Sequence, residues 1–124
     1  MSVGPHNWEP LRADLVIWVR GIDSATAFAG LLNLLESERR YQYQDIAGEL
    51  LEKGEIPCPL SLSEFLRRVL PLWDLSAATV PKYAAREFGR DAVLKHLHQL
   101  LADEVPWASR DQIDTMRYHL GEDV

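Results

Sequence analysis

Four histidines are the side chains in this sequence with the most obvious chemistry, because imidazole serves both metal binding and acid–base catalysis. His96 and His98 are two positions apart, a rotation of about 200° on a helix, so their rings leave on different sides. None of the four histidines lies in the Glu-x-x-His spacing of di-iron bundles or in His-Glu-x-x-His. The sequence therefore predicts no metal site.

Serine and cysteine nucleophiles are not set in any of the common catalytic patterns. The sequence holds no Gly-x-Ser-x-Gly elbow and no Gly-rich phosphate-binding loop. Cys58 is the single cysteine and lies between two prolines, with charged residues but no histidine nearby. A Cys-Pro pair ligates haem iron in some regulatory proteins, but two residues are an unspecific signal. We expect no catalytic activity and no cofactor, since an enzyme or a haem-linked sensor would need a site assembled from distant residues.

Residues 66–85 resemble a helix-turn-helix unit in the spacing of their apolar side chains. The five positions that pack such a unit hold Val69, Trp73, Leu75, Val80 and Tyr83. The segment 61–90 carries five basic and three acidic residues, whereas the rest of the chain carries 8 basic and 16 acidic residues. A DNA-facing patch on an acidic protein would show this segregation of charge.

The helix-turn-helix hypothesis predicts a DNA-binding transcriptional regulator that uses residues 61–90. The residues expected to face DNA are Arg67, Arg68, Lys82 and Arg86 at phosphates, with Ser76 or Thr79 near bases and Ala77 also outward. Against this hypothesis, Asp74 replaces the turn glycine, and Pro71 and Pro81 fall inside the two helices. The net charge of -6 also disfavours a nucleic-acid partner.

Aromatic and arginine residues, which anchor many protein interfaces, favour a different function. The residues expected at an exposed binding surface are Arg39, Arg40, Tyr41, Tyr43 and Trp107. Because the chain lacks a catalytic pattern, the leading prediction is a small protein–protein interaction module: an adaptor, a regulator or an oligomeric subunit. Its expected partner is another protein, a second copy of the chain in a homodimer, or both.

The elements that must position these residues are predicted to be helical. The sequence has 19 Leu and 12 Ala against 8 Val, 5 Ile and 3 Thr, which favours helices over strands. Apolar periodicity and capping residues predict six or seven short helices, near residues 8–20, 24–40, 43–53, 61–70, 79–88, 91–103 and 109–120. Capping-box patterns begin two of them, at Ser61-x-x-Glu64 and Ser109-x-x-Gln112. We expect an all-α, compact bundle.

Two points of topology stay open in the sequence. Residues 24–53 can form one helix or two. The apolar run 15–19 can belong to a helix or be a buried strand. In the helix, the side chains of one face would be Trp8, Leu11, Leu15, Trp18 and Ile22. If 41–45 were a strand as well, residues 15–45 would form a βαβ unit and the class would be α+β.

Length and composition frame the whole molecule. The chain has 124 residues, 47% of them apolar, which suits one helical domain over 1–124 with flexible ends at 1–7 and 121–124. No apolar run approaches the roughly 20 residues that cross a bilayer, and the N-terminus lacks the regions of a signal peptide. We therefore expect a soluble protein of the cytoplasm that has no membrane partner.

Overall fold

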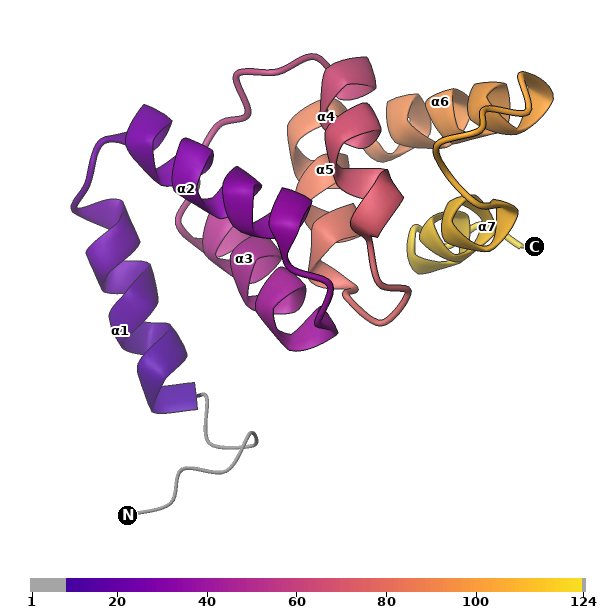
Figure 1. The fold of residues 1–124 in the computed structure, drawn as a ribbon. Coiled ribbons are helices and arrows are strands. Elements are labelled where there is room, and N and C mark those ends of the chain that lie inside the picture. The colour runs from indigo at the N-terminus through magenta and orange to yellow at the C-terminus, as the bar shows by residue number, and fades with distance from the viewer. Residues whose placement is uncertain (1–8, 124) are drawn as a thin grey trace.

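The computed structural model describes residues 9–123, with side chains from Asp14 onward, and contains seven α-helices in that range (Figure 1). They are α1 (Glu9–Arg20), α2 (Ser24–Ser37), α3 (Tyr41–Lys53), α4 (Leu62–Val69), α5 (Thr79–Phe88), α6 (Arg90–Ala102) and α7 (Arg110–His119), with a 3₁₀ turn η1 (Leu70–Leu72) after α4. Because residues 9–123 contain no strand, the all-α prediction is confirmed and the βαβ alternative for residues 15–45 is wrong. The predicted flexible segment 1–7 lies outside the described residues.

A break at residues 38–40 divides the segment 24–53 into two helices. Asp23 caps α2, since its carboxylate accepts a hydrogen bond from the Thr26 N–H at 3.1 Å. The backbone is extended at Glu38 and again at Arg40, which ends α2 and begins α3. The open question of one helix or two is therefore settled in favour of two.

The contact between α3 and α5 forms the centre of the bundle, with α2 on one side and α6 and α7 on the other (Figure 1). Gly48 lies where α3 and α5 meet, and a Cβ there would be 2.5 Å from the Thr79 hydroxyl and 3.0 Å from backbone atoms of α5. Thr79 donates from its N–H to the Asp45 carboxylate at 3.0 Å and from its hydroxyl to the Asp45 carbonyl at 2.6 Å. The largest fully buried side chains of the core include Tyr83, Phe65, Leu51, Leu97 and Met116.

Both predicted capping boxes are present. The Ser61 hydroxyl accepts from the Glu64 N–H at 3.2 Å and begins α4. The Ser109 hydroxyl accepts from the Gln112 N–H at 3.0 Å and begins α7. Pro71 follows α4 and lies in η1, as expected for a proline that ends a helix. These local signals fix the two segments that form the site described below.

The acidic C-terminal segment, which was predicted to be flexible, contacts α6 and α7 through Glu122. The Glu122 carboxylate is 2.9 Å from the His98 ring nitrogen and pairs with the Arg117 guanidinium. The hydrogen bond from His98, followed by that from Arg117, lowers the pKa of Glu122. Residue 122 is thus placed by an ion pair.

α1 lies at one edge of the bundle and packs mainly on α3 (Figure 1). Val19 is buried and reaches the backbone of Gly54, where a Cβ would lie 2.9 Å from Val19 Cγ1. Leu15 and Ile22 of the predicted apolar face pack against the core, whereas Trp18, assigned to the same face, is 61% exposed. Trp8 and the Leu11 side chain, also assigned to that face, lie outside the described residues. Five consecutive apolar residues surround the helix axis, and their periodicity therefore fixes no single inward face.

Candidate protein-binding surface

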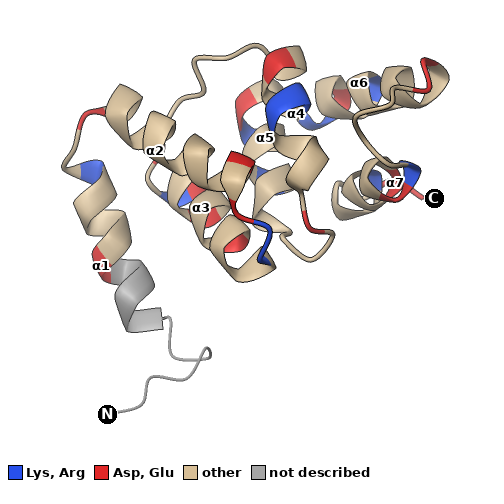
Figure 2. Ribbon diagram, viewed as in Figure 1, with Lys and Arg blue, Asp and Glu red and all other residues tan. Residues whose placement is uncertain are grey.

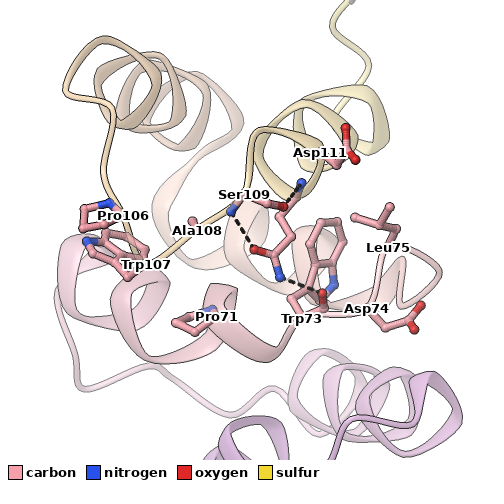
Figure 3. Close-up of a pocket in the computed structure, with 10 residues that line it drawn as sticks. Pro71, Trp73, Asp74, Leu75, Pro106, Trp107, Ala108, Ser109 and Asp111 are labelled. Carbon is pink, nitrogen blue, oxygen red and sulfur yellow. Dashed lines mark hydrogen bonds between the residues drawn. The ribbon is translucent and has the colours of Figure 1, made fainter.

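A hollow of about 600 Å³ opens between the segment that follows α4 and the start of α7 (Figure 3). We call it the Trp107 groove. Its lining residues are Pro71, Trp73, Asp74, Leu75, Pro106, Trp107, Ala108, Ser109, Asp111 and Gln112. Pro71, Pro106 and Leu75 are exposed at its edges, and Pro71 lies between the two tryptophans in Figure 3. The groove therefore offers a ligand two prolines, Leu75 and the half-buried Trp107 ring among a larger polar surface, while Trp73 is buried beneath it.

A second hollow, of about 210 Å³, adjoins the Trp107 groove. The two share Pro71, Trp73, Asp74 and Gln112, and the second adds Leu72 and Arg39. Two of the residues predicted at a binding surface, Arg39 and Trp107, therefore line adjoining hollows although they are far apart in the sequence. The α2–α3 connection, η1 and the segment before α7 converge there.

Gln44 positions the side of this surface that carries Arg39. Its side chain is fully buried, and its amide group donates to the carbonyls of Glu38 and Leu72, both at 2.7 Å. Its oxygen accepts from the Asp74 N–H at 2.8 Å. One buried amide thus joins the turn before Arg39 to the backbone of residues 72–74, with both donors and its acceptor in use.

Gln112 and His119 hold the other wall of the Trp107 groove. The Gln112 side chain donates to the Trp73 carbonyl at 3.1 Å, and the Trp73 indole N–H donates to the Ala77 carbonyl at 3.1 Å (Figure 3 shows the first bond). The His119 ring nitrogen lies 2.9 Å from the Leu75 carbonyl oxygen. Side chains from α3 and α7 therefore fix the irregular backbone of residues 72–77.

The rim of the surface carries charges of both signs. The Asp74 and Asp111 carboxylates lie on the side away from Trp107 (Figure 3). The Arg67 guanidinium lies over the Trp107 ring, 4.9 Å from its centroid, which is a cation–π contact. Arg39 is exposed and forms no ion pair with any side chain in the described range 14–123. The surface thus combines Pro71 and the half-buried Trp107 ring with polar and charged side chains of both signs, and an extended peptide that carries apolar and charged residues can bind there.

Two of the other residues predicted with Arg39, namely Arg40 and Tyr43, contact each other. The Arg40 guanidinium pairs with the Glu38 carboxylate at 2.9 Å and lies 4.5 Å from the centroid of the Tyr43 ring. The hydrogen bond from the Arg40 side chain lowers the pKa of Glu38 to about 2. Tyr41 is exposed at the start of α3. Of these four predicted residues, Arg39 is the one that lines the second hollow.

The supposed recognition helix of the helix-turn-helix hypothesis, α5, is central in the fold. Ala77 is fully buried, and the Thr79 hydroxyl is hydrogen-bonded to α3, so the predicted outward position of these two residues is wrong. The physical reason is the close approach of α5 to Gly48. Ser76 and Lys82 are exposed, as predicted.

Three of the four basic residues of that hypothesis already contact other parts of the chain. Arg67 lies over Trp107, Arg68 pairs with Glu36 at 3.3 Å, and Arg86 donates to the Glu52 carbonyl. Figure 2 shows basic residues on several separate elements with acidic residues between them. These placements give no added support to DNA binding, which stays a prediction.

Cys58 and Tyr83 anchor the loop between α3 and α4. The Cys58 N–H donates to the Glu87 carboxylate at 2.6 Å, and the Tyr83 hydroxyl donates to the Ile56 carbonyl at 2.8 Å. Burial raises the pKa of the Cys58 thiol and the pKa of Tyr83, so both groups are protonated at neutral pH. Within the described part of the chain, no three His, Cys, Asp or Glu residues are placed to hold a metal ion.

Several residues of the site were not predicted from the sequence. They are Gln44, Pro71, Asp74, Leu75, Asp111 and Gln112. Pro71 and Pro106 indicate loops in the two segments that line the groove, and the capping pattern at Ser109 indicates the start of α7. No local pattern pairs one segment with the other, because their proximity results from the packing of α3, α5 and α7.

Comparison with known proteins finds no match to this chain among protein-family models, curated proteins or solved structures. Among the described residues, no helix has both the length and the apolar character needed to cross a membrane. The function must therefore be argued from the surface itself.

Proposed function

We propose that the chain is a small protein–protein interaction module of the cytoplasm, an adaptor, regulator or oligomeric subunit without catalytic activity. The observation that carries this proposal is the convergence of Arg39 and Trp107 on two adjoining hollows. Exposed apolar side chains rimmed by charge are typical of surfaces that bind other proteins.

The geometry favours an extended segment of the partner over a helix or a globular face. The Trp107 groove is built mainly from loop residues, and its accessible apolar part consists of two prolines, Leu75 and the Trp107 ring, against which a proline or other apolar residue of an extended peptide can pack. Asp111, which lines the Trp107 groove alone, favours a basic side chain of the peptide there. Arg39 lines the second hollow together with Asp74 and favours a carboxylate in that hollow.

The groove is held in shape before any ligand binds. Gln44 and Gln112 fix the backbone of residues 72–74 through hydrogen bonds of 2.7 to 3.1 Å. A preformed site loses little conformational entropy on binding, which allows a small surface to bind a short peptide.

Selection from a random linear peptide library displayed on phage, with the purified chain as bait, tests the proposal. We expect enriched peptides to contain a basic residue and a proline or other apolar residue. Their binding should weaken by roughly tenfold or more in Trp107→Ala and in Asp111→Asn. Tyr118→Ala is the matched control, because Tyr118 is an exposed aromatic residue that lines neither hollow.

Two results would contradict the proposal. One is the absence of enriched peptides. The other is enrichment of peptides that bind Trp107→Ala and Asp111→Asn as well as the unaltered chain. Binding of duplex DNA that weakens with added salt, and that Lys82→Ala reduces while Trp107→Ala does not, would favour the helix-turn-helix alternative instead.

A further inference from the structure

The outward face of α1 exposes two large apolar side chains next to each other. Ile17 is 71% exposed and Trp18 is 61% exposed, whereas the neighbouring Val19 is buried. Single exposed apolar residues are common on proteins, but adjacent ones on a helix that packs through one side form a patch. Asp14 and Gly21 lie on the same outward side of the helix and are also exposed. This face has no partner in the described part of the chain.

A hollow of about 500 Å³ lies directly beside this face. Its lining residues are Val16, Arg20, Glu52, Lys53, Glu55 and Arg86. It therefore combines three cationic side chains with two carboxylates and one apolar side chain, a net positive lining in a chain of net charge -6.

The two arginines of the hollow are held in place by the C-terminal end of α3. Arg20 donates to the Lys53 carbonyl from Nε at 3.1 Å and from Nη2 at 2.6 Å. Arg86 donates to the Glu52 carbonyl. Carbonyls at the end of a helix attract cations, so both guanidinium groups are fixed at the hollow.

The order of residues around α1 places the patch and the hollow on opposite flanks of Ile17. At about 100° per residue, Trp18 lies on one flank of Ile17, and Val16 and Arg20 lie on the other. In a parallel helix pair, each flank faces the opposite flank of the partner, as the two charged flanks of a parallel coiled coil do. In an antiparallel pair like flanks face each other, and the two Trp18 side chains would meet while the hollows stayed empty.

We propose that a second copy of this chain docks on α1 in a parallel, two-fold arrangement, with Trp18 of each copy in the Val16–Arg20 hollow of the other. The indole face is electron-rich and attracts the guanidinium groups of Arg20 and Arg86, while Val16 supplies an apolar contact. Because the dimer has two-fold symmetry, the contact between Trp18 and the hollow occurs twice. The proposal is independent of the Trp107 groove, because α7, whose start lines that groove, lies at the opposite end of the molecule from α1 (Figure 1).

Sedimentation velocity over a dilution series is the test. A pair of short helices with two inserted side chains lies at the small end of stable interfaces, so we expect a reversible dimer that dissociates on dilution. Trp18→Ala should be monomeric over the whole series. Arg86→Met should weaken the dimer by roughly tenfold, the effect of losing a desolvated cation–π contact. Tyr118→Ala should dimerise like the unaltered chain.

Disulfide trapping tests the parallel arrangement. In a Cys58→Ser background, Gly21→Cys should form an oxidised dimer, because the two copies of residue 21 face each other only when the helices run in parallel. Circular dichroism confirms that each variant is folded. A chain that is monomeric at every concentration overturns the proposal, as does a dimer that persists in Trp18→Ala or that Gly21→Cys fails to trap. Peptides selected on the Trp107 groove should still bind Trp18→Ala, so failure of one proposal leaves the other standing.

Discussion

Where α3 meets α5 and η1, a polar side chain is buried, whereas on α1 apolar side chains lie in solvent. Gln44 is fully buried and makes three hydrogen bonds, and Thr79 is bonded twice to Asp45. Ile17 and Trp18 are exposed on a helix that packs through one side. Both regions depart from the usual distribution, in which polar side chains are exposed and apolar side chains are buried, and the two departures serve different purposes. Buried polar groups position the backbone of the site, and exposed apolar groups are available to partners.

Of the substitutions that test this comparison, replacing Gln44 is expected to cause the largest loss of unfolding free energy. Gln44→Leu leaves the partly buried Glu38 and Leu72 carbonyls and the partly buried Asp74 N–H without this partner, at a cost of about 3 kcal/mol in unfolding free energy. Urea unfolding followed by circular dichroism measures this loss. Gln42→Leu, two positions away on the same helix, should change the unfolding free energy by less than about 1 kcal/mol. Equal losses in the two variants would show that Gln44 has no special role.

A pair of glycine substitutions tests whether α3 and α5 meet as closely as the structure indicates. Gly48→Ala places a Cβ against α5 backbone atoms and should cost about 2 kcal/mol, net of the gain in helix propensity. Gly30→Ala, on α2, has open space around the added methyl group and should stabilise the fold by roughly 0.5–1 kcal/mol. Thermal unfolding of the two variants under one condition gives the comparison. A gain in both would contradict the close contact at Gly48.

Two adjacent residues of α1, the buried Val19 and the exposed Trp18, allow the effect of burial on the unfolding free energy to be measured directly. Val19→Ala removes two buried methyl groups and should cost roughly 1.5 kcal/mol. Trp18→Ala should change the unfolding free energy of the monomer by less than about 0.5 kcal/mol, because its ring contributes little to the monomer's core. Denaturant unfolding at a concentration that keeps the chain monomeric measures both. If Trp18→Ala proves the costlier change, α1 is rotated relative to the structure.

The smallest expected effect is a pH dependence at the turn that carries Arg39. The Arg40 hydrogen bond holds the pKa of Glu38 at about 2 in the folded chain, against 4.5 for the free group. As the pH falls below 4.5, the unfolded chain binds this proton first, so the contribution of the pair is lost between about pH 4.5 and pH 2. The difference in unfolding midpoint between the unaltered chain and Glu38→Gln should therefore narrow across that interval. If the difference in unfolding midpoint stayed constant across this interval, the Arg40–Glu38 pair would not be the cause of the difference.

Much of the fold could be predicted from the sequence because the signals that begin and end helices are local. The capping boxes that begin at Ser61 and Ser109 each act within a few residues, and each lies where the pattern predicts. The orientation of α1 could be predicted only in part: Leu15 and Ile22 of the predicted face pack against the core but Trp18 does not, because an unbroken apolar run gives no single preferred face. Thr79 was expected at the surface because its burial depends on a close contact with Gly48, which is distant in sequence and which no local pattern indicates.

The candidate site could be predicted only in its separate parts. Arg39 and Trp107 were selected by residue type, and the structure brings them to adjoining hollows. Arg40 and Tyr43 were selected by the same reasoning, yet they contact each other and Glu38. The residue that joins the parts, Gln44, has no signature in the sequence. In the sequence, a glutamine that makes two long-range hydrogen bonds and one to Glu38 looks like any polar residue of an amphipathic helix.

The central claim is that the Trp107 groove binds an extended segment of another protein. The most direct measurement is a titration of ¹⁵N-labelled chain with a peptide selected on it, followed by NMR. We predict that the largest shifts occur at the Trp73 indole N–H, the Gln112 side-chain amide and the Ser109 backbone N–H, and that Trp107→Ala abolishes them. Shifts that concentrate on α1 or around Lys82, or that persist in Trp107→Ala, would contradict the account.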